Sequence, residues 1–242
     1  MATLHLIGGE KGGTGKSLVT RTAAQYHLDR GLDFSLFDGG NSVEDVKRTY
    51  QSIGCSSIIF TEDEERHDQP NFLYSAAKEK TTLVNLPPQV GIPLKDWLER
   101  NNLVNRAKED GVEITYWFVC NGEPASVRLL DEHLSYFQGS INHVLVKNLM
   151  RNNTLAELEE NQSLQQKIKD YEVKVVDFPR FLGRSFLDEI IAKGLTFGEA
   201  REEQEFHPLN RSQLTATLEE AYQRFDEAGV FDDEGEREEE VA

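Results

Sequence analysis

The sequence predicts an α/β fold: a doubly wound, mostly parallel sheet with helices on both faces. Two observations lead to this expectation. Short apolar runs that suit buried strands alternate along the chain with segments whose apolar residues recur every three or four positions. This alternation extends over most of the 242 residues, a length that fits one domain. Strands that alternate with helices pair in parallel through right-handed crossovers, so a mostly parallel sheet follows.

The first strand and the first helix frame a glycine-rich segment. Residues 3–8 (TLHLIG) form an apolar run long enough for one strand. After Gly15 the apolar residues recur with helical spacing until Gly31, a typical helix stop. Between them lies GGEKGGTGKS (8–17), in which five of ten residues are glycine and two are lysine.

The other elements follow the same two patterns. Further strands are expected at 34–38, 56–60, 81–91 (interrupted by two prolines), 113–121, 141–148 and 172–179. Further helices are expected at 43–52, 70–78, 93–109, from Pro124 onward, and at 154–168, 184–194 and 211–228. Ligands of such folds bind beyond the carboxyl ends of the strands. This edge is expected to carry Gly8, Asp38, Asn85 and Asn148.

The segment 8–17 has the composition of a phosphate-binding loop. In a strand–loop–helix context, consecutive backbone N–H groups and the helix N-terminus point at phosphate oxygens. Lys16 is then expected to reach the terminal phosphates, and Ser17 to offer its hydroxyl to magnesium. The competing interpretation is a flexible loop with incidental lysines.

The loop departs from the ordinary Walker A pattern, because Glu10 stands where that pattern has its first glycine. The residues KGGTGKS (11–17) resemble the deviant Walker motif, K-G-G-x-G-K-[ST], of the ParA/MinD family of dimerising ATPases. Within that family, the residues around the loop are similar to those of plasmid mobilisation and conjugal-transfer members, and the resemblance extends over roughly residues 1–195.

This resemblance implies a P-loop NTPase fold that uses ATP and Mg²⁺. By resemblance, the catalytic residues are Lys11, Lys16 and Asp38, and the metal ligands are Ser17 and Asp38. The implied nucleotide contacts are Gly12, Gly13, Thr14, Gly15, Lys16, Ser17, Leu18, Asn148 and Pro179.

Lys11 distinguishes this family from other phosphate-loop proteins. By resemblance, it reaches across a homodimer interface to the partner's nucleotide, in a role similar to an arginine finger. The alternative is an ordinary surface lysine in a glycine loop.

Two acids expected from the family pattern are absent. The first switch commonly reads Asp-x-Asp, but here Asp38 is followed by Gly39 and Gly40. Asp38 has a second interpretation, as a cap of the next helix. In LVNLPP (83–88) the place of the Walker B acid is taken by Asn85, which can hydrogen-bond a metal-bound water but brings no charge. A buried strand with a polar end explains Asn85 equally well.

Asn148 resembles the asparagine with which the family reads the adenine edge, since its amide both donates and accepts. Residues 178–180, which include Pro179, are expected beside the base. A turn asparagine is the competing interpretation of Asn148.

The charge composition of the chain limits the partners that we expect it to bind. The net charge of −17 argues against non-specific DNA binding through a global positive field, so DNA binding is expected to be weak. Residues 231–242, with seven acids and one arginine, suit a solvated, disordered tail after an ATPase domain at 1–230. Basic residues gather at Arg151, Arg180, Arg184, Lys193 and Arg201, but interspersed acids favour a solvated helical face.

Membrane binding is not expected, because no run approaches the roughly 20 apolar residues of a spanning helix and the C-terminus is acidic rather than basic and amphipathic. Cys55 and Cys120 lie far apart without metal-ligand spacing, which suits reduced, buried thiols. Without a signal peptide, the simple expectation is a cytoplasmic protein.

The leading functional hypothesis is an ATP-dependent molecular switch. The chain would dimerise around ATP, recruit an unidentified protein partner in DNA mobilisation, partition or positioning, and hydrolyse ATP slowly. A nucleotide-binding scaffold without hydrolysis is consistent with Gly40 and Asn85. A metabolic ATP-dependent ligase or kinase on the same fold would need further catalytic groups, which the sequence does not offer.

Overall fold

A seven-stranded parallel sheet forms the centre of the protein, in the order β3-β2-β4-β1-β5-β6-β7. The computed structural model describes residues 2–40, 45–148, 154–181 and 183–231. The strands are β1 (Ala2–Gly8), β2 (Phe34–Asp38), β3 (Ser56–Ser57), β4 (Thr81–Asn85), β5 (Val112–Cys120), β6 (Asn142–Asn148) and β7 (Lys174–Phe178). Every described pair is parallel, which confirms the predicted fold class.

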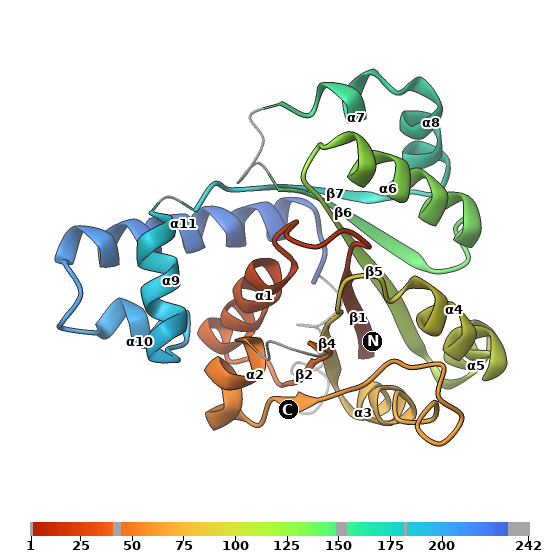
Figure 1. Ribbon diagram of the computed structural model, residues 1–242, viewed down its shortest axis with the longest axis horizontal. Helices are drawn as coiled ribbons and strands as arrows, with labels where there is room; N and C mark the ends of the chain where they lie inside the picture. The colour runs from red at the N-terminus through yellow and green to blue at the C-terminus, as the bar shows by residue number, and fades with distance from the viewer. Residues whose placement is uncertain (1, 41–44, 149–153, 182, 232–242) are drawn as a thin grey trace, which may run out of the picture.

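Helices cover both faces of the sheet (Figure 1). On one face lie α1 (Lys16–Arg30), α2 (Asp45–Tyr50), α9 (Arg184–Lys193), α10 (Phe197–Glu202) and α11 (Pro208–Glu227). On the other lie α3 (Asn71–Glu79), α4 (Gly91–Arg100), α5 (Leu103–Asp110), α6 (Pro124–Phe137), α7 (Ala156–Glu160) and α8 (Gln162–Asp170). Each face has its own apolar core, because alternate residues of the buried strands point to opposite sides.

The strand order places a switch point beside β1. From β1 the chain goes out to β2 and β3 and returns through β4; it then crosses β1 to β5, β6 and β7. Gly8, Asp38, Asn85 and Asn148 end β1, β2, β4 and β6, so they lie at the carboxyl edge of the sheet, as predicted. The crevice at such a point is where ligands of doubly wound sheets bind.

Two of the predicted helices are each divided in two. The segment 93–109 forms α4 and α5, separated at Asn101 and Asn102, and Asn102 has a left-handed φ of 48°. The segment 154–168 forms α7 and α8, because the side chain of Asn161 accepts from the N–H of Leu164 and thereby caps a new helix. Asparagine adopts such conformations at little cost, so the single-helix predictions were wrong at these residues.

A short helix, α10, was missed by the sequence analysis. It begins with a capping box in which Thr196 and Glu199 satisfy each other's backbone N–H groups. The spacing Thr-x-x-Glu before an apolar residue is the available signal for this helix start. The predicted strand 56–60 is also shorter in the structure, since β3 contains only Ser56 and Ser57.

The end of the described chain packs into the protein. Phe231 is buried against Trp117 and His5, whose ring centroids both lie 5.3 Å from its own. Phe231 was predicted as the first residue of the tail, and the rest of that segment, 232–242, lies outside the described residues. Cys55 and Cys120 are both buried and form no disulfide, as expected. None of the helices formed by the described residues has the length and apolar character needed to span a bilayer.

Candidate phosphate-binding site

The loop between β1 and α1 has an open backbone cradle at the carboxyl edge of the sheet. Gly9, Gly13 and Gly15 have φ values of 135°, 75° and 102°, which favour glycine because other residues adopt them rarely. Gly12 and Gly13 are exposed, and nothing lies within 4 Å of a Cβ placed on Gly12. Such a loop can bring backbone N–H groups close to an anion at the start of α1.

Lys16 is the buried cation of this cradle. It is the first residue of α1, its side chain is only 7% exposed, and its Nζ donates to the carbonyl oxygen of Lys11 at 2.9 Å. Burial lowers the pKa of Lys16 to about 8, while the negative charge of Glu10 acts in the opposite direction. An anionic ligand in the cradle would therefore supply the counter-charge that this ammonium needs.

Asn148 supports the loop from the adjacent strand end. Its Nδ2 donates to the carbonyl oxygen of Thr14 at 2.6 Å, and a Cβ on Gly15 would lie 2.1 Å from that nitrogen. Gly15 thus permits both the backbone turn and this close approach. The structure gives Asn148 a role in holding the loop, whereas its reading of adenine stays a prediction. Pro179 is buried directly after β7, and Leu18 packs against the core beneath α1.

Lys11 lies on the accessible side of the loop and has an acidic neighbour in the same chain. Its ammonium forms an ion pair with Glu123, the residue that precedes α6. Both side chains are more than a third exposed, so water weakens this pair. Lys11 is therefore accessible, and its action across a dimer interface stays a prediction.

Ser17, Asn85 and Asp38 meet beside the cradle. The amide Nδ2 of Asn85 donates to Asp38 Oδ1 at 2.9 Å and lies 3.5 Å from Ser17 Oγ. The amide oxygen of Asn85 accepts from Thr20 at 3.2 Å. The structure therefore brings together the positions from which the sequence predicted metal binding. Thr20, one helical turn after Lys16, is a member of this network that the sequence analysis missed.

Asp38 also organises the segment that follows β2. Its two carboxylate oxygens accept from the backbone N–H groups of Gly40, Val46 and Lys47, at 2.9–3.1 Å. With Asn85 as a fourth donor, the carboxylate has no obvious free lone pair left. These contacts agree with the helix-capping interpretation, and metal binding by Asp38 stays a prediction.

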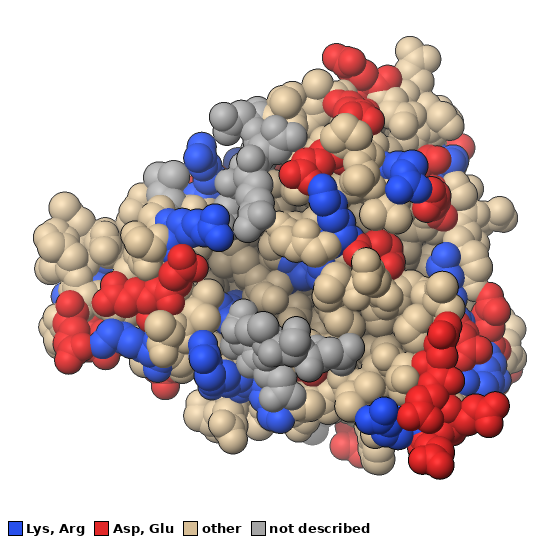
Figure 2. All heavy atoms as spheres, viewed as in Figure 1, with Lys and Arg blue, Asp and Glu red and all other residues tan. Residues whose placement is uncertain are grey.

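The predicted basic cluster is diluted by ion pairs. Lys193 pairs with Glu205, Arg201 pairs with Asp29, and Arg180 is exposed; Arg151 lies outside the described residues. In the view of Figure 2, basic and acidic side chains are mixed over the surface. Acidic side chains gather at the lower right, where Figure 1 places α3, α5 and the loop before α3.

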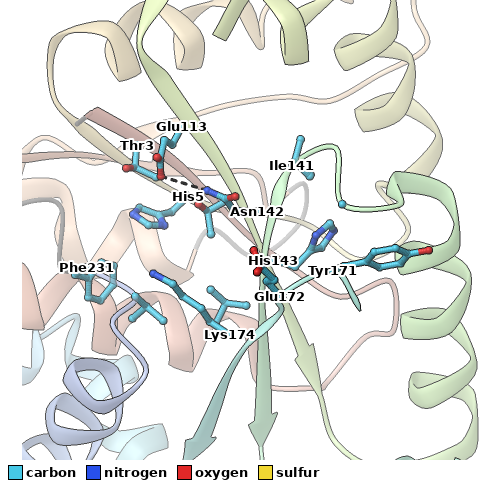
Figure 3. Close-up of a pocket in the computed structure, with 14 residues that line it drawn as sticks. Thr3, His5, Glu113, Ile141, Asn142, His143, Tyr171, Glu172, Lys174 and Phe231 are labelled. Carbon is cyan, nitrogen blue, oxygen red and sulfur yellow. Dashed lines mark hydrogen bonds between the residues drawn. The ribbon is translucent and has the colours of Figure 1, made fainter. Parts of the chain in front are cut away.

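A separate pocket of about 340 Å³ lies at the opposite, amino-terminal edge of the sheet (Figure 3). Thr3 and His5 of β1, Glu113 of β5 and Lys174 of β7 surround it, and Phe231 closes one side. Glu113 accepts from Asn142 at 3.2 Å. This pocket lies at the sheet edge opposite the glycine loop, so it is separate from the candidate phosphate-binding site.

A glycine cradle between the first strand and first helix of a parallel sheet, with a buried lysine at the helix start, defines a P-loop NTPase fold. The second lysine, Lys11, makes the loop a deviant Walker A loop.

Comparisons with known proteins agree with this class. No protein-family model matches the chain. The chain is 26% identical to protein MobD of Acidithiobacillus ferrooxidans over 219 residues, which cover 90% of this chain and 94% of that protein. The fold is similar to that of the cell division ATPase MinD of Pyrococcus furiosus, with a TM-score of 0.51 and 14% identity over 94% of this chain and 99% of that chain. The chain therefore has the fold of a P-loop NTPase, and it is similar in sequence to MobD and in fold to MinD.

Proposed function

We propose that this protein is an ATP-operated molecular switch. It binds ATP with Mg²⁺ at residues 11–18, forms a homodimer around the nucleotide, and recruits a protein partner in the mobilisation, partition or positioning of DNA. The cradle around Lys16 carries this proposal, because a buried ammonium at a helix N-terminus has no better ligand than a phosphate. Similarity to MobD supports this family of roles.

The residues present fit a nucleotide. In the described structure the Lys16 ammonium donates to a carbonyl oxygen and not to a carboxylate, so it can turn to a phosphate without breaking a hydrogen-bonded ion pair. The exposed glycines leave room above the loop. Lys11 lies at the rim and can contact a nucleotide held by a second copy once it leaves Glu123.

Fewer of the residues present suit a magnesium ion than suit the nucleotide. Ser17 is half-buried beside the cradle and would hold the ion together with phosphate oxygens. Bound magnesium would neutralise charge on the phosphates. Asn85 contributes no charge here, and its amide nitrogen already donates to Asp38.

These departures lead us to propose slow hydrolysis. Phosphoryl transfer depends on positioning and electrostatics, and two of the three expected acidic positions hold Gly40 and Asn85. The scaffold without hydrolysis is the second candidate, favoured by the same Asn85–Asp38 contact. Phosphate release from ATP separates the two candidates. Turnover on the order of 1–100 s⁻¹, typical of kinases, would contradict both.

Nucleotide binding is tested by calorimetric titration of the full chain with ADP and with a non-hydrolysable ATP analogue. Lys16→Ala is expected to abolish most of the affinity, and Lys108→Ala, at an exposed position of α5 outside the loop, serves as a control. Equal affinity for the wild type and Lys16→Ala would overturn the assignment of the site.

Dimerisation is tested by sedimentation in each nucleotide state. We expect ATP, and not ADP, to produce a dimer, and Lys11→Ala to remain a monomer while it still binds nucleotide. A monomeric wild type in every state would contradict the switch mechanism without contradicting nucleotide binding.

A further inference from the structure

Glu10 joins the phosphate loop to the loop that follows β4. Residues 86–90 run beside the phosphate loop and end at the start of α4 (Figure 1). The N–H of Leu86 donates to the carbonyl of Ile7 at 2.9 Å, and the N–H of Gln89 donates to the carbonyl of Glu10 at 3.1 Å. The Glu10 carboxylate then accepts from the N–H of Gly91 at 3.2 Å.

The surrounding backbone is fitted to this carboxylate. A Cβ on Gly91 would lie 2.8 Å from Glu10 Oε1, so a larger residue at that position would displace the carboxylate from its present contact. Gln89 has a left-handed φ of 58°, which non-glycine residues adopt rarely, and its N–H is held by Glu10. Gly91 is also the first residue of α4, where a negative charge is favoured by the unpaired N–H groups of the helix.

Glu10 immediately precedes Lys11, whose carbonyl oxygen accepts from Lys16 Nζ at 2.9 Å. The negative charge of Glu10 acts on Lys16, which lies buried in the same loop. A phosphate that binds at Lys16 therefore brings its own negative charge close to the Glu10 carboxylate. Repulsion between these charges weakens the hold of Glu10 on Gly91.

We propose that Glu10 is a positioning residue that fastens residues 86–90 and the first turn of α4 onto the phosphate loop, and that bound nucleotide loosens this attachment. The fastening follows from the contacts of the free protein alone. The loosening rests on the proposed nucleotide binding. Together, these two effects make the attachment of the first turn of α4 depend on whether the phosphate loop holds a nucleotide.

Amide hydrogen exchange of residues 86–95 in the full chain tests the fastening without any ligand. Glu10→Ala removes the acceptor, and we expect exchange at Gly91 to rise at least about tenfold, as for the loss of a hydrogen bond to a charged group. Glu10→Gln keeps an acceptor oxygen and is expected to retain most of the protection. Glu79→Ala, at an exposed position of α3, is the matched control and is expected to exchange like the wild type. Wild-type protection of Gly91 in Glu10→Ala would overturn the proposal.

The same exchange measured with and without saturating ADP tests the loosening. We expect ADP to accelerate exchange at Gly91 in the wild type, but not in Glu10→Gln, which lacks the repelled charge. Slower or unchanged exchange in wild type with ADP bound would overturn the loosening. If ADP does not bind at all, the proposed function and the loosening both fail, while the ligand-free comparison still decides the fastening.

Discussion

Lys16 is buried in the loop that we propose binds phosphate, so we expect its protonation to be coupled to binding. Burial lowers its pKa to about 8 in the free protein, and a bound phosphate favours the charged form. Lys16 is protonated below pH 8 and neutral above it. The affinity for ADP is therefore expected to fall by about tenfold from pH 7 to pH 9, in proportion to the charged fraction.

Titrations of fluorescent ADP at several pH values measure this dependence. Lys16→Met is the control, since any binding that it retains should not change over the same range. A wild-type affinity that stays constant to pH 9 would show that Lys16 does not supply the charge.

The Asn85–Asp38 contact predicts a response to magnesium. With aspartate at position 85, two carboxylates would lie about as close as the present amide and carboxylate, 2.9 Å apart, in a buried site. Their repulsion is expected to lower the melting temperature of Asn85→Asp in the absence of metal. Added Mg²⁺ should restore the melting temperature of Asn85→Asp and leave that of the wild type nearly unchanged. An Asn85→Asp protein as stable as the wild type in EDTA would contradict this reasoning.

At the scale of elements, β6 and α6 bury two histidines against Tyr116 of β5. The ring of His133 lies 4.0 Å from that of Tyr116 and 5.3 Å from that of His143, measured between centroids. Tyr116 in turn accepts from the N–H of Gly9 in the phosphate loop at 3.1 Å. Burial lowers the pKa of His143 to about 4 and that of His133 well below its usual value.

This pair predicts a loss of stability in acid. The unfolded chain binds protons to these histidines near pH 6.5, whereas folded His143 does so only near pH 4, so the free energy of unfolding falls as the pH drops from about 6.5 to 4. His143→Leu is expected to flatten that slope, by about 1 proton at most, in urea unfolding measured at pH 7 and pH 5. His207→Leu, at the exposed start of α11, is the control. An unchanged slope in His143→Leu would show that His143 does not cause the loss of stability in acid.

The bounds of some elements were predictable from sequence patterns alone. β2 spans Phe34–Asp38 as predicted. Its short apolar run lies between the helix stop at Gly31 and the two glycines after Asp38, so a strand is the simplest way for its backbone to form hydrogen bonds. The sequence analysis overlooked a change of helical phase in the segments 93–109 and 154–168. The buried residues on either side of each break lie five positions apart (Leu98 and Leu103) or six apart (Leu158 and Leu164), rather than three or four. Local hydrogen bonds of asparagine side chains, from Asn101 to the carbonyl of Trp97 and from the N–H of Leu164 to Asn161, accompany the two breaks.

For the whole molecule, net charge predicts weak attraction to DNA. At −17, the chain repels a phosphate backbone, and the exposed basic residues near α9 are partly paired. Fluorescence anisotropy with random duplex DNA at physiological salt should show little binding, and any binding should weaken steeply with added salt. Tight binding that Arg180→Ala with Arg184→Ala removes would show that a local patch outweighs the global charge.

The sequence by itself determined the strand–loop–helix unit, the parallel α/β class and the place of the glycine-rich loop, because these depend on short-range spacing and periodicity. Only the tertiary structure decided what those residues contact. Lys11 lies beside Glu123, Asn148 holds Thr14, and Glu10 reaches Gly91 across 81 positions of the chain. Such contacts depend on strand order, which brings the ends of β1, β4, β5 and β6 to one edge, and no local pattern encodes that order.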